Sequence, residues 1–83
     1  MEAVVDAPAA EVAARVGGWA RVEPLTATTC TFRMETDELD GPVFALGFTG
    51  AAFRVVGPPE LTERVRTWAE RLAAAGARAG IPG

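Results

Sequence analysis

The stretch that decides the fold is residues 51–75, AAFRVVGPPELTERVRTWAERLAAA, which joins a strand to a helix through a double-proline corner. Gly57 lets the backbone leave the strand freely. Pro58 is held in an extended conformation because another proline follows it. Pro59 suits the first turn of a helix, where a missing N–H costs nothing. The strand, the corner and the helix are therefore specified locally.

The helix after the corner is amphipathic. Its apolar residues recur at intervals of four, three and four positions, which places them on one stripe, while charged residues occupy the other faces. The stripe consists of Leu61, Val65, Trp68 and Leu72. Such a helix must pack on another surface.

The opening of the chain predicts a strand, a helix and a second strand. The strands are expected at residues 2–6 and 20–25, and Pro8 begins the helix between them. A glycine pair at positions 17–18 ends this helix. The residues expected on its apolar face are Val12, Val16 and, as a cap, Trp19.

Residues 29–36 alternate in polarity, which is the pattern of a strand with one buried face. The apolar side carries Cys30, Phe32 and Met34, and the polar side carries Thr31, Arg33 and Glu35. The next helix has two possible starts, a cap at residues 36–37 or a first turn delayed to Asp40 by Pro42. Residues 52–56 are expected to form the fourth strand.

The element order predicts an α+β domain. It is β-α-β-β-α-β followed by a third helix, which corresponds to a ferredoxin-like split βαβ fold with an additional C-terminal helix. The first and third strands should then be central, with both crossover helices on one face. The expected core residues are Val12, Val16, Cys30, Phe32, Met34 and Leu46. We assign residues 1–75 to this single domain and residues 76–83 to a flexible tail.

Composition restricts the classes of function. The 83 residues include no Lys, His, Ser, Asn, Gln or Tyr, and the eight arginines are interspersed with eleven acidic residues for a net charge of −3. Because a basic cluster is missing, this piece alone should not bind nucleic acid. The missing His, Ser and Lys remove most general-base and nucleophilic mechanisms, so we expect neither an enzyme nor a cofactor. A single cysteine and no signal or membrane-spanning segment indicate the cytoplasm.

Two groups of residues have reactive or metal-binding character. Cys30 alternates with Phe32 on an apolar strand face, which favours core packing over a reactive thiol. Residues 35–40 contain four carboxylates, but aligned with a calcium loop they put Gly47 at the position of the obligatory glutamate. A solvated helix N-terminus explains these acids better than a metal site.

Three residues, Arg33, Arg54 and Trp68, are candidates for contacts with a ligand or partner. The outward positions of the third strand offer no aromatic for stacking RNA bases, because Phe32 lies on the other side. Arg33 and Arg54 lie on the open sheet face and could contact an anionic ligand or a partner's acid, although isolated arginines are more often solvated. Trp19 is expected to fill the core, and Trp68 to lie either in the core or at an interface.

Segments along most of the chain show a resemblance to a known family. They are residues 6–11 (DAPAAE), Trp19, residues 22–25 (VEPL) and residues 46–61 with the double proline. Together they resemble the C-terminal extension, or WCX domain, that follows the WYL domain in bacterial transcription regulators. One departure is Gly41-Pro42, where the family leads us to expect an uninterrupted apolar helix.

The resemblance implies a regulatory module. Such regulators carry a helix-turn-helix at the N-terminus and a WYL sensor in the middle, so the chain would be a C-terminal fragment whose partners are those two domains. It would contribute to a homodimer and transmit a signal by domain packing. An alternative from another class is a free-standing ferredoxin-like sensor that binds an anionic metabolite near Arg33 or Arg54.

Overall fold

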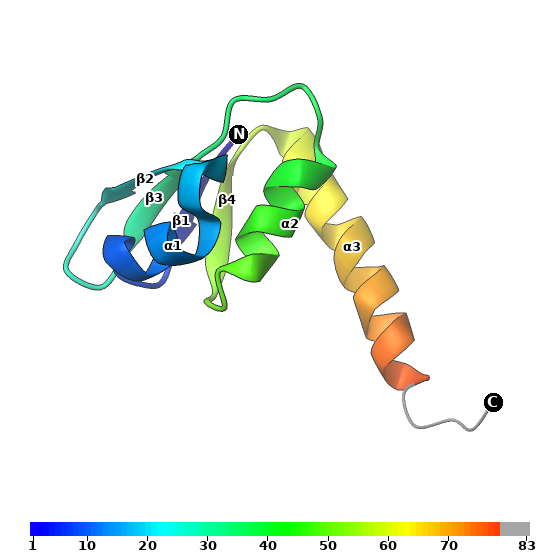
Figure 1. The fold of residues 1–83 in the computed structure, drawn as a ribbon. Helices are drawn as coiled ribbons and strands as arrows, with labels where there is room; N and C mark the ends of the chain where they lie inside the picture. The colour runs from blue at the N-terminus through cyan, green and yellow to red at the C-terminus, as the bar shows by residue number, and fades with distance from the viewer. Residues whose placement is uncertain (79–83) are drawn as a thin grey trace.

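The computed structural model describes residues 1–78 and shows an α+β domain with one four-stranded antiparallel sheet and three helices (Figure 1). Its elements, in chain order, are β1 (Glu2–Val5), α1 (Ala9–Val16), the 3₁₀ turn η1 (Gly17–Trp19), β2 (Arg21–Pro24), β3 (Cys30–Arg33), α2 (Asp40–Phe48), β4 (Phe53–Gly57) and α3 (Pro59–Ala77). The expected α+β class is confirmed.

The sheet has the strand order β2-β3-β1-β4, so the first and third strands are central, as predicted. Every neighbouring pair is antiparallel. In β1, the small Ala3 lies opposite Phe32 of β3 and Val55 of β4. Because side chains alternate along a strand, Ala3 and Val5 face the core while Glu2 and Val4 face the other side of the sheet.

The core lies between one face of the sheet and the two helices α1 and α2. Its buried residues are Ala3, Val5, Val12, Val16, Cys30, Phe32, Ala45 and Leu46. Five of the six predicted core residues are therefore buried. The sixth, Met34, is only half-buried, because β3 ends at Arg33 instead of continuing to residue 36. The backbone N–H of Met34 donates to the carbonyl of Met1 at 2.9 Å.

The helix α1 ends where a glycine is required. Gly17 has φ +56°, a conformation that residues with a side chain rarely adopt. The chain then makes the turn η1, which carries Trp19 to the surface, where it is 49% exposed. The prediction that Trp19 fills the core is therefore wrong, because η1 moves the residue away from the buried face of α1.

The helix α2 begins at Asp40, the later of the two starts considered. Pro42 is buried in its first turn, where a proline is tolerated because the N–H groups there lack partners within the helix. The capping side chain is Glu38, whose two carboxylate oxygens accept the N–H of Gly41 at 2.9 and 3.0 Å. Thr36 does not cap the helix, because its hydroxyl accepts the N–H of Glu38 in the preceding loop.

The double-proline corner leads directly into α3. Pro59 is the first residue of the helix, and Pro58 precedes it in an extended conformation with φ −79° and ψ 170°. The carbonyl of Pro58 accepts the N–H of Leu61 at 3.0 Å, so the first turn closes on the corner. Gly57 does not have a positive φ, and the peptide bond between Gly57 and Pro58 is cis. Gly57 therefore does not adopt the left-handed conformation that glycine makes available.

The first half of α3 packs on the body of the domain, and the second half projects from it (Figure 1). Leu61 is the only fully buried residue of the helix, and every residue of 69–78 is exposed. The helix continues through Gly76 to Ala77, two residues beyond the predicted boundary at Ala75. Residues 79–83, the rest of the predicted tail, lie outside the described part of the chain.

The buried Cys30 gives a first test of the core. Its side chain is 0% exposed, and burial raises the pKa of the thiol, which further lowers the fraction of reactive thiolate. We expect a thiol reagent such as DTNB to modify Cys30 at least a hundredfold more slowly in the native protein than in urea. A free thiol of ordinary reactivity in the native state would contradict the assignment of Cys30 to the core.

Candidate functional site

In the described part of the chain α1 and α2 cover one face of the sheet (Figure 1), and the two predicted arginines lie on the other, open face. Arg33 pairs with Glu2 of β1, with 3.6 Å between Arg33 Nε and Glu2 Oε1, and both side chains are more than a third exposed. Exposed ion pairs of this kind contribute little to stability. Arg21 of β2 lies directly opposite Arg33 in the sheet, and both residues line one hollow.

Arg54 lies on β4, at the other side of the sheet. It lines a shallow hollow with Val4, Asp6 and Thr29, whereas Arg33 lines a different hollow with Arg21 and Trp19. The strand β1 separates the two arginines. The structure therefore does not bring Arg33 and Arg54 together in one site, and their role as ligand contacts stays a prediction.

The acidic segment before and within α2 has structural roles that account for two of its four carboxylates. Glu38 caps α2, and Asp40 binds α3. Among residues 1–78, no group of three or more His, Cys, Asp or Glu side chains is arranged to hold a metal ion. These contacts support the interpretation of the segment as a helix N-terminus.

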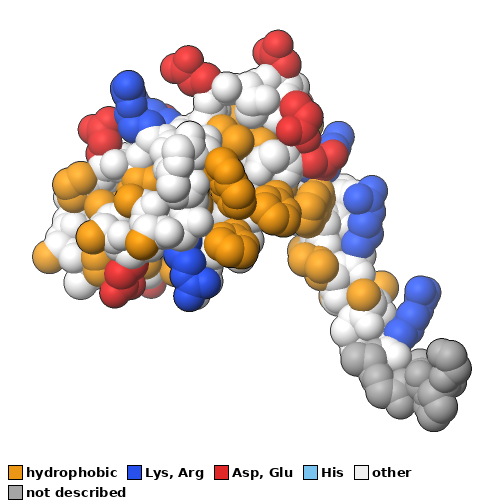
Figure 2. Space-filling model, viewed as in Figure 1, with side chains coloured by type: hydrophobic (Ala, Val, Ile, Leu, Met, Phe, Trp, Pro, Cys, Tyr) orange, Lys and Arg blue, Asp and Glu red, His pale blue; other side chains and the backbone are white. Residues whose placement is uncertain are grey.

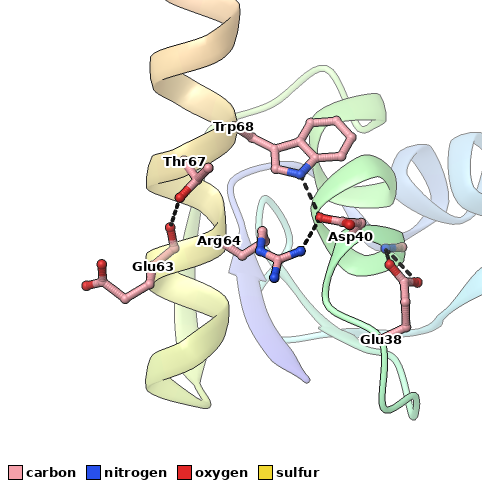
Figure 3. A network of polar contacts seen from close by, with 7 residues as sticks. Glu38, Asp40, Glu63, Arg64, Thr67 and Trp68 are labelled. Atoms are coloured by element: carbon pink, nitrogen blue, oxygen red, sulfur yellow. Dashed lines mark hydrogen bonds and ion pairs between the residues drawn. The ribbon is translucent and has the colours of Figure 1, made fainter.

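Trp68, the third predicted contact residue, joins α3 to α2 (Figure 3). Its indole Nε1–H donates to Oδ1 of Asp40 at 2.9 Å, and Nη1 of Arg64 donates to the same oxygen at 2.7 Å. The two donors come from successive turns of α3, and the acceptor is the first residue of α2. One carboxylate thus links the two helices at the end where both begin.

The carboxylate of Asp40 is stabilised in its charged form. The hydrogen bond from Trp68 and then that from Arg64 lower the pKa of Asp40 below its ordinary value of 3.8. Because the folded-state pKa lies below the unfolded one, the link is complete above about pH 4 and is lost as the pH falls through the folded pKa.

We therefore expect acidification below about pH 4 to loosen α3 from α2, as the pH falls through the lowered pKa of Asp40. The measurement is the fluorescence of Trp68 in a Trp19→Phe background, which removes the other tryptophan. The matched control is Asp40→Asn, whose amide oxygen still accepts a hydrogen bond but does not titrate. An identical fluorescence titration in this control would show that Asp40 is not the group responsible.

The helices α2 and α3 diverge from the end where both begin (Figure 1). An apolar groove of about 370 Å³ lies between them. We call this groove the wedge. Its main lining residues are Phe44 and Phe48 of α2, Phe53 of β4, and Val65, Trp68 and Leu72 of α3. In the space-filling view, apolar side chains gather on this side of the molecule (Figure 2).

The wall of the wedge on α2 continues into an aromatic cluster. The ring centroid of Trp19 lies 5.6 Å from that of Phe44 and 5.9 Å from that of Phe48, and the two phenylalanines stack at 6.2 Å. Phe44 and Phe48 are 50% and 47% exposed. Neither Phe44 nor Phe48 was predicted from the sequence to belong to a site. The available signal was that α2 is apolar on all sides, a pattern that indicates a helix needing cover on more than one face.

These features can be compared with known proteins. Residues 1–73, nearly the whole of the described chain, match the sequence pattern of one protein family, the WCX domain. The chain belongs to the WCX domain family. No curated protein and no solved structure matches it significantly.

Membership in the WCX family places the chain in the context of WYL-type regulators, as the resemblance implied. The WCX domain is not a catalytic family, which agrees with the shortage of catalytic residues in the sequence. Among the described residues, no helix combines the length and the hydrophobicity needed to cross a bilayer. Gly41 and Pro42, the departure from the expected pattern, lie in the first turn of α2, and the helix continues from there to Phe48.

Proposed function

We propose that this WCX domain is the C-terminal regulatory and oligomerisation module of a WYL-type transcription regulator. It acts by packing against other domains and transmitting a signal, and not by catalysis. The observation that carries the proposal is the family match over residues 1–73. The partners are the regulator's own WYL and helix-turn-helix domains and a second subunit, and the place of action is the cytoplasm.

The surfaces of the domain support a packing role. One face of the sheet has no helix over it, and the wedge presents aromatic side chains to solvent. Exposed apolar surfaces of this kind are typical of protein–protein contacts. The net charge of −3 makes direct contact with DNA by this module unfavourable, so DNA recognition belongs to another domain.

We also propose that the fold is of the ferredoxin-like class with α3 as an addition. The support is the β-α-β-β-α-β order of the elements before α3, together with the sheet order β2-β3-β1-β4 and its antiparallel pairs.

The first experiment is to sequence the native gene upstream of Met1. The proposal predicts an open frame that encodes a helix-turn-helix and a WYL domain. Deleting residues 1–78 from that regulator should then reduce its effector-dependent change in operator affinity, measured by fluorescence anisotropy, while its helix-turn-helix remains folded. A stop codon and a ribosome-binding site immediately before Met1 would contradict the proposal and favour a free-standing sensor of an anionic metabolite.

A further inference from the structure

The wedge is incomplete as a protein surface. Phe44 and Phe48 on one wall are each about half exposed, and Leu72 on the other wall is 64% exposed. A single exposed apolar side chain needs no explanation, but these residues line one continuous groove. The groove therefore has the character of an interface without its partner.

The second half of α3 also lacks a partner. All residues from Ala69 to Arg78 are exposed, and the helix projects away from the body there (Figure 1). Helices of this length are marginal in water unless an apolar face packs on another surface. The face exists here, because Leu72, Ala75 and Gly76 continue the stripe that begins with Leu61 and Val65.

The unpacked half of α3 and the wedge are both apolar surfaces without cover in the described residues. The wedge is bounded by two helices and needs a third, amphipathic helix with a narrow apolar stripe. The second half of α3 is such a helix. Its residues Ala69 and Leu72 form part of the α3 wall of its own wedge and leave the groove open. In a dimer with a two-fold axis, the second half of each α3 can lie in the wedge of the other copy. Both surfaces are then covered, because each copy supplies one wedge and one helix.

The charges favour an antiparallel orientation. Residues 34–53, which lead into and form the α2 wall, contain four acidic residues and no basic one. Residues 69–78 of α3 contain Arg71 and Arg78 against a single acid, Glu70. Acidic side chains gather where α2 and α3 begin, and basic side chains are found along α3 toward its far end (Figure 2). If α3 of another copy runs antiparallel to α2 and α3, its basic C-terminal half lies near the N-termini of these two helices. The negative end of its helix dipole then lies there as well.

We propose that α3 of a second copy of this chain lies antiparallel in the wedge, with the reciprocal insertion completing a two-fold symmetric dimer. This pairing rests on the proposed role as an oligomerisation module and specifies its surface. Phe44, Phe48 and Trp68 form the walls, and Leu72 of the partner enters between them.

The test is sedimentation equilibrium of the 83-residue chain and its variants. Leu72→Glu places a charge in the centre of the contact, twice per dimer, and should raise the dimer dissociation constant at least a hundredfold. The control is Ala74→Glu, which adds the same charge to the opposite face of the same helix and should leave association unchanged. Circular dichroism checks that both variants keep the native helix content.

A charge exchange tests the orientation. Arg78→Glu should weaken the dimer about tenfold, and the addition of Asp37→Arg should restore its affinity, because the two positions then exchange signs across the interface. Failure of the double variant to recover would overturn the antiparallel arrangement.

Other outcomes distinguish this proposal from the proposed function. A wild-type chain that remains monomeric at about 1 mM would overturn the second copy as the occupant of the wedge. Binding of a separately produced WYL domain that is abolished by Leu72→Glu would instead assign the wedge to that domain. In either case the proposed regulatory role is tested separately, by the sequence of the gene upstream of Met1.

Discussion

Phe32→Ala is expected to lower the free energy of unfolding by about 3–5 kcal/mol, because it removes a fully buried aromatic ring and leaves a cavity. Phe32 lies on the central strand β3, between Val22 of β2 and Ala3 of β1, and has the greatest volume among the fully buried side chains. Native domains are stable by only about 5–15 kcal/mol, and a chain of this length belongs at the lower end. The variant should therefore retain only about 0–2 kcal/mol of stability and lie close to its unfolding midpoint. Urea denaturation followed by circular dichroism measures the difference.

The matched control is Phe44→Ala. This substitution removes the same ring from the α2 wall of the wedge, where the side chain is 50% exposed. We expect a loss of about 1 kcal/mol, since only half of the apolar surface is withdrawn from water in the native state. Equal losses for the two variants would mean that Phe32 is not in a tightly packed core.

The position of Phe32 could be predicted because its signal is local. A strand with one buried face alternates in polarity, and the alternation of Cys30 and Phe32 with Thr31 and Arg33 needs no knowledge of the rest of the fold. The corner at Pro58 and Pro59 is local in the same way, since proline restricts its own backbone and that of the preceding residue.

The junction of α2 and α3 could not be predicted, because it depends on contacts between distant residues. Asp40 is 24 residues from Arg64 and 28 from Trp68, and nothing in the local sequence pairs them. The sequence analysis treated Asp40 as one of several solvated acids. Trp19 was misplaced for a similar reason, because its location depends on the η1 turn and on the rings of Phe44 and Phe48.

Leu61→Ala is expected to lower the free energy of unfolding by about 2–5 kcal/mol and to detach α3 from the body. Leu61 is the one residue of α3 that is fully buried, and it follows the corner by two positions. Without its side chain, the helix is held mainly by half-buried contacts of Val65 and Trp68 and by the bonds to Asp40. Denaturation at a low protein concentration, followed by the fluorescence of Trp68, measures the loss.

The informative comparison is Leu72→Ala, on the same stripe of the same helix. In an isolated chain this change should cost less than about 0.5 kcal/mol, because Leu72 is 64% exposed. If the wedge holds a second copy, the cost of Leu72→Ala will rise with protein concentration, since anything bound only by the folded state adds to its stability. The cost of Leu61→Ala should be large at every concentration, because its cavity lies within one chain. A Leu72→Ala variant that is as unstable as Leu61→Ala in dilute solution would show instead that the second half of α3 packs on its own domain.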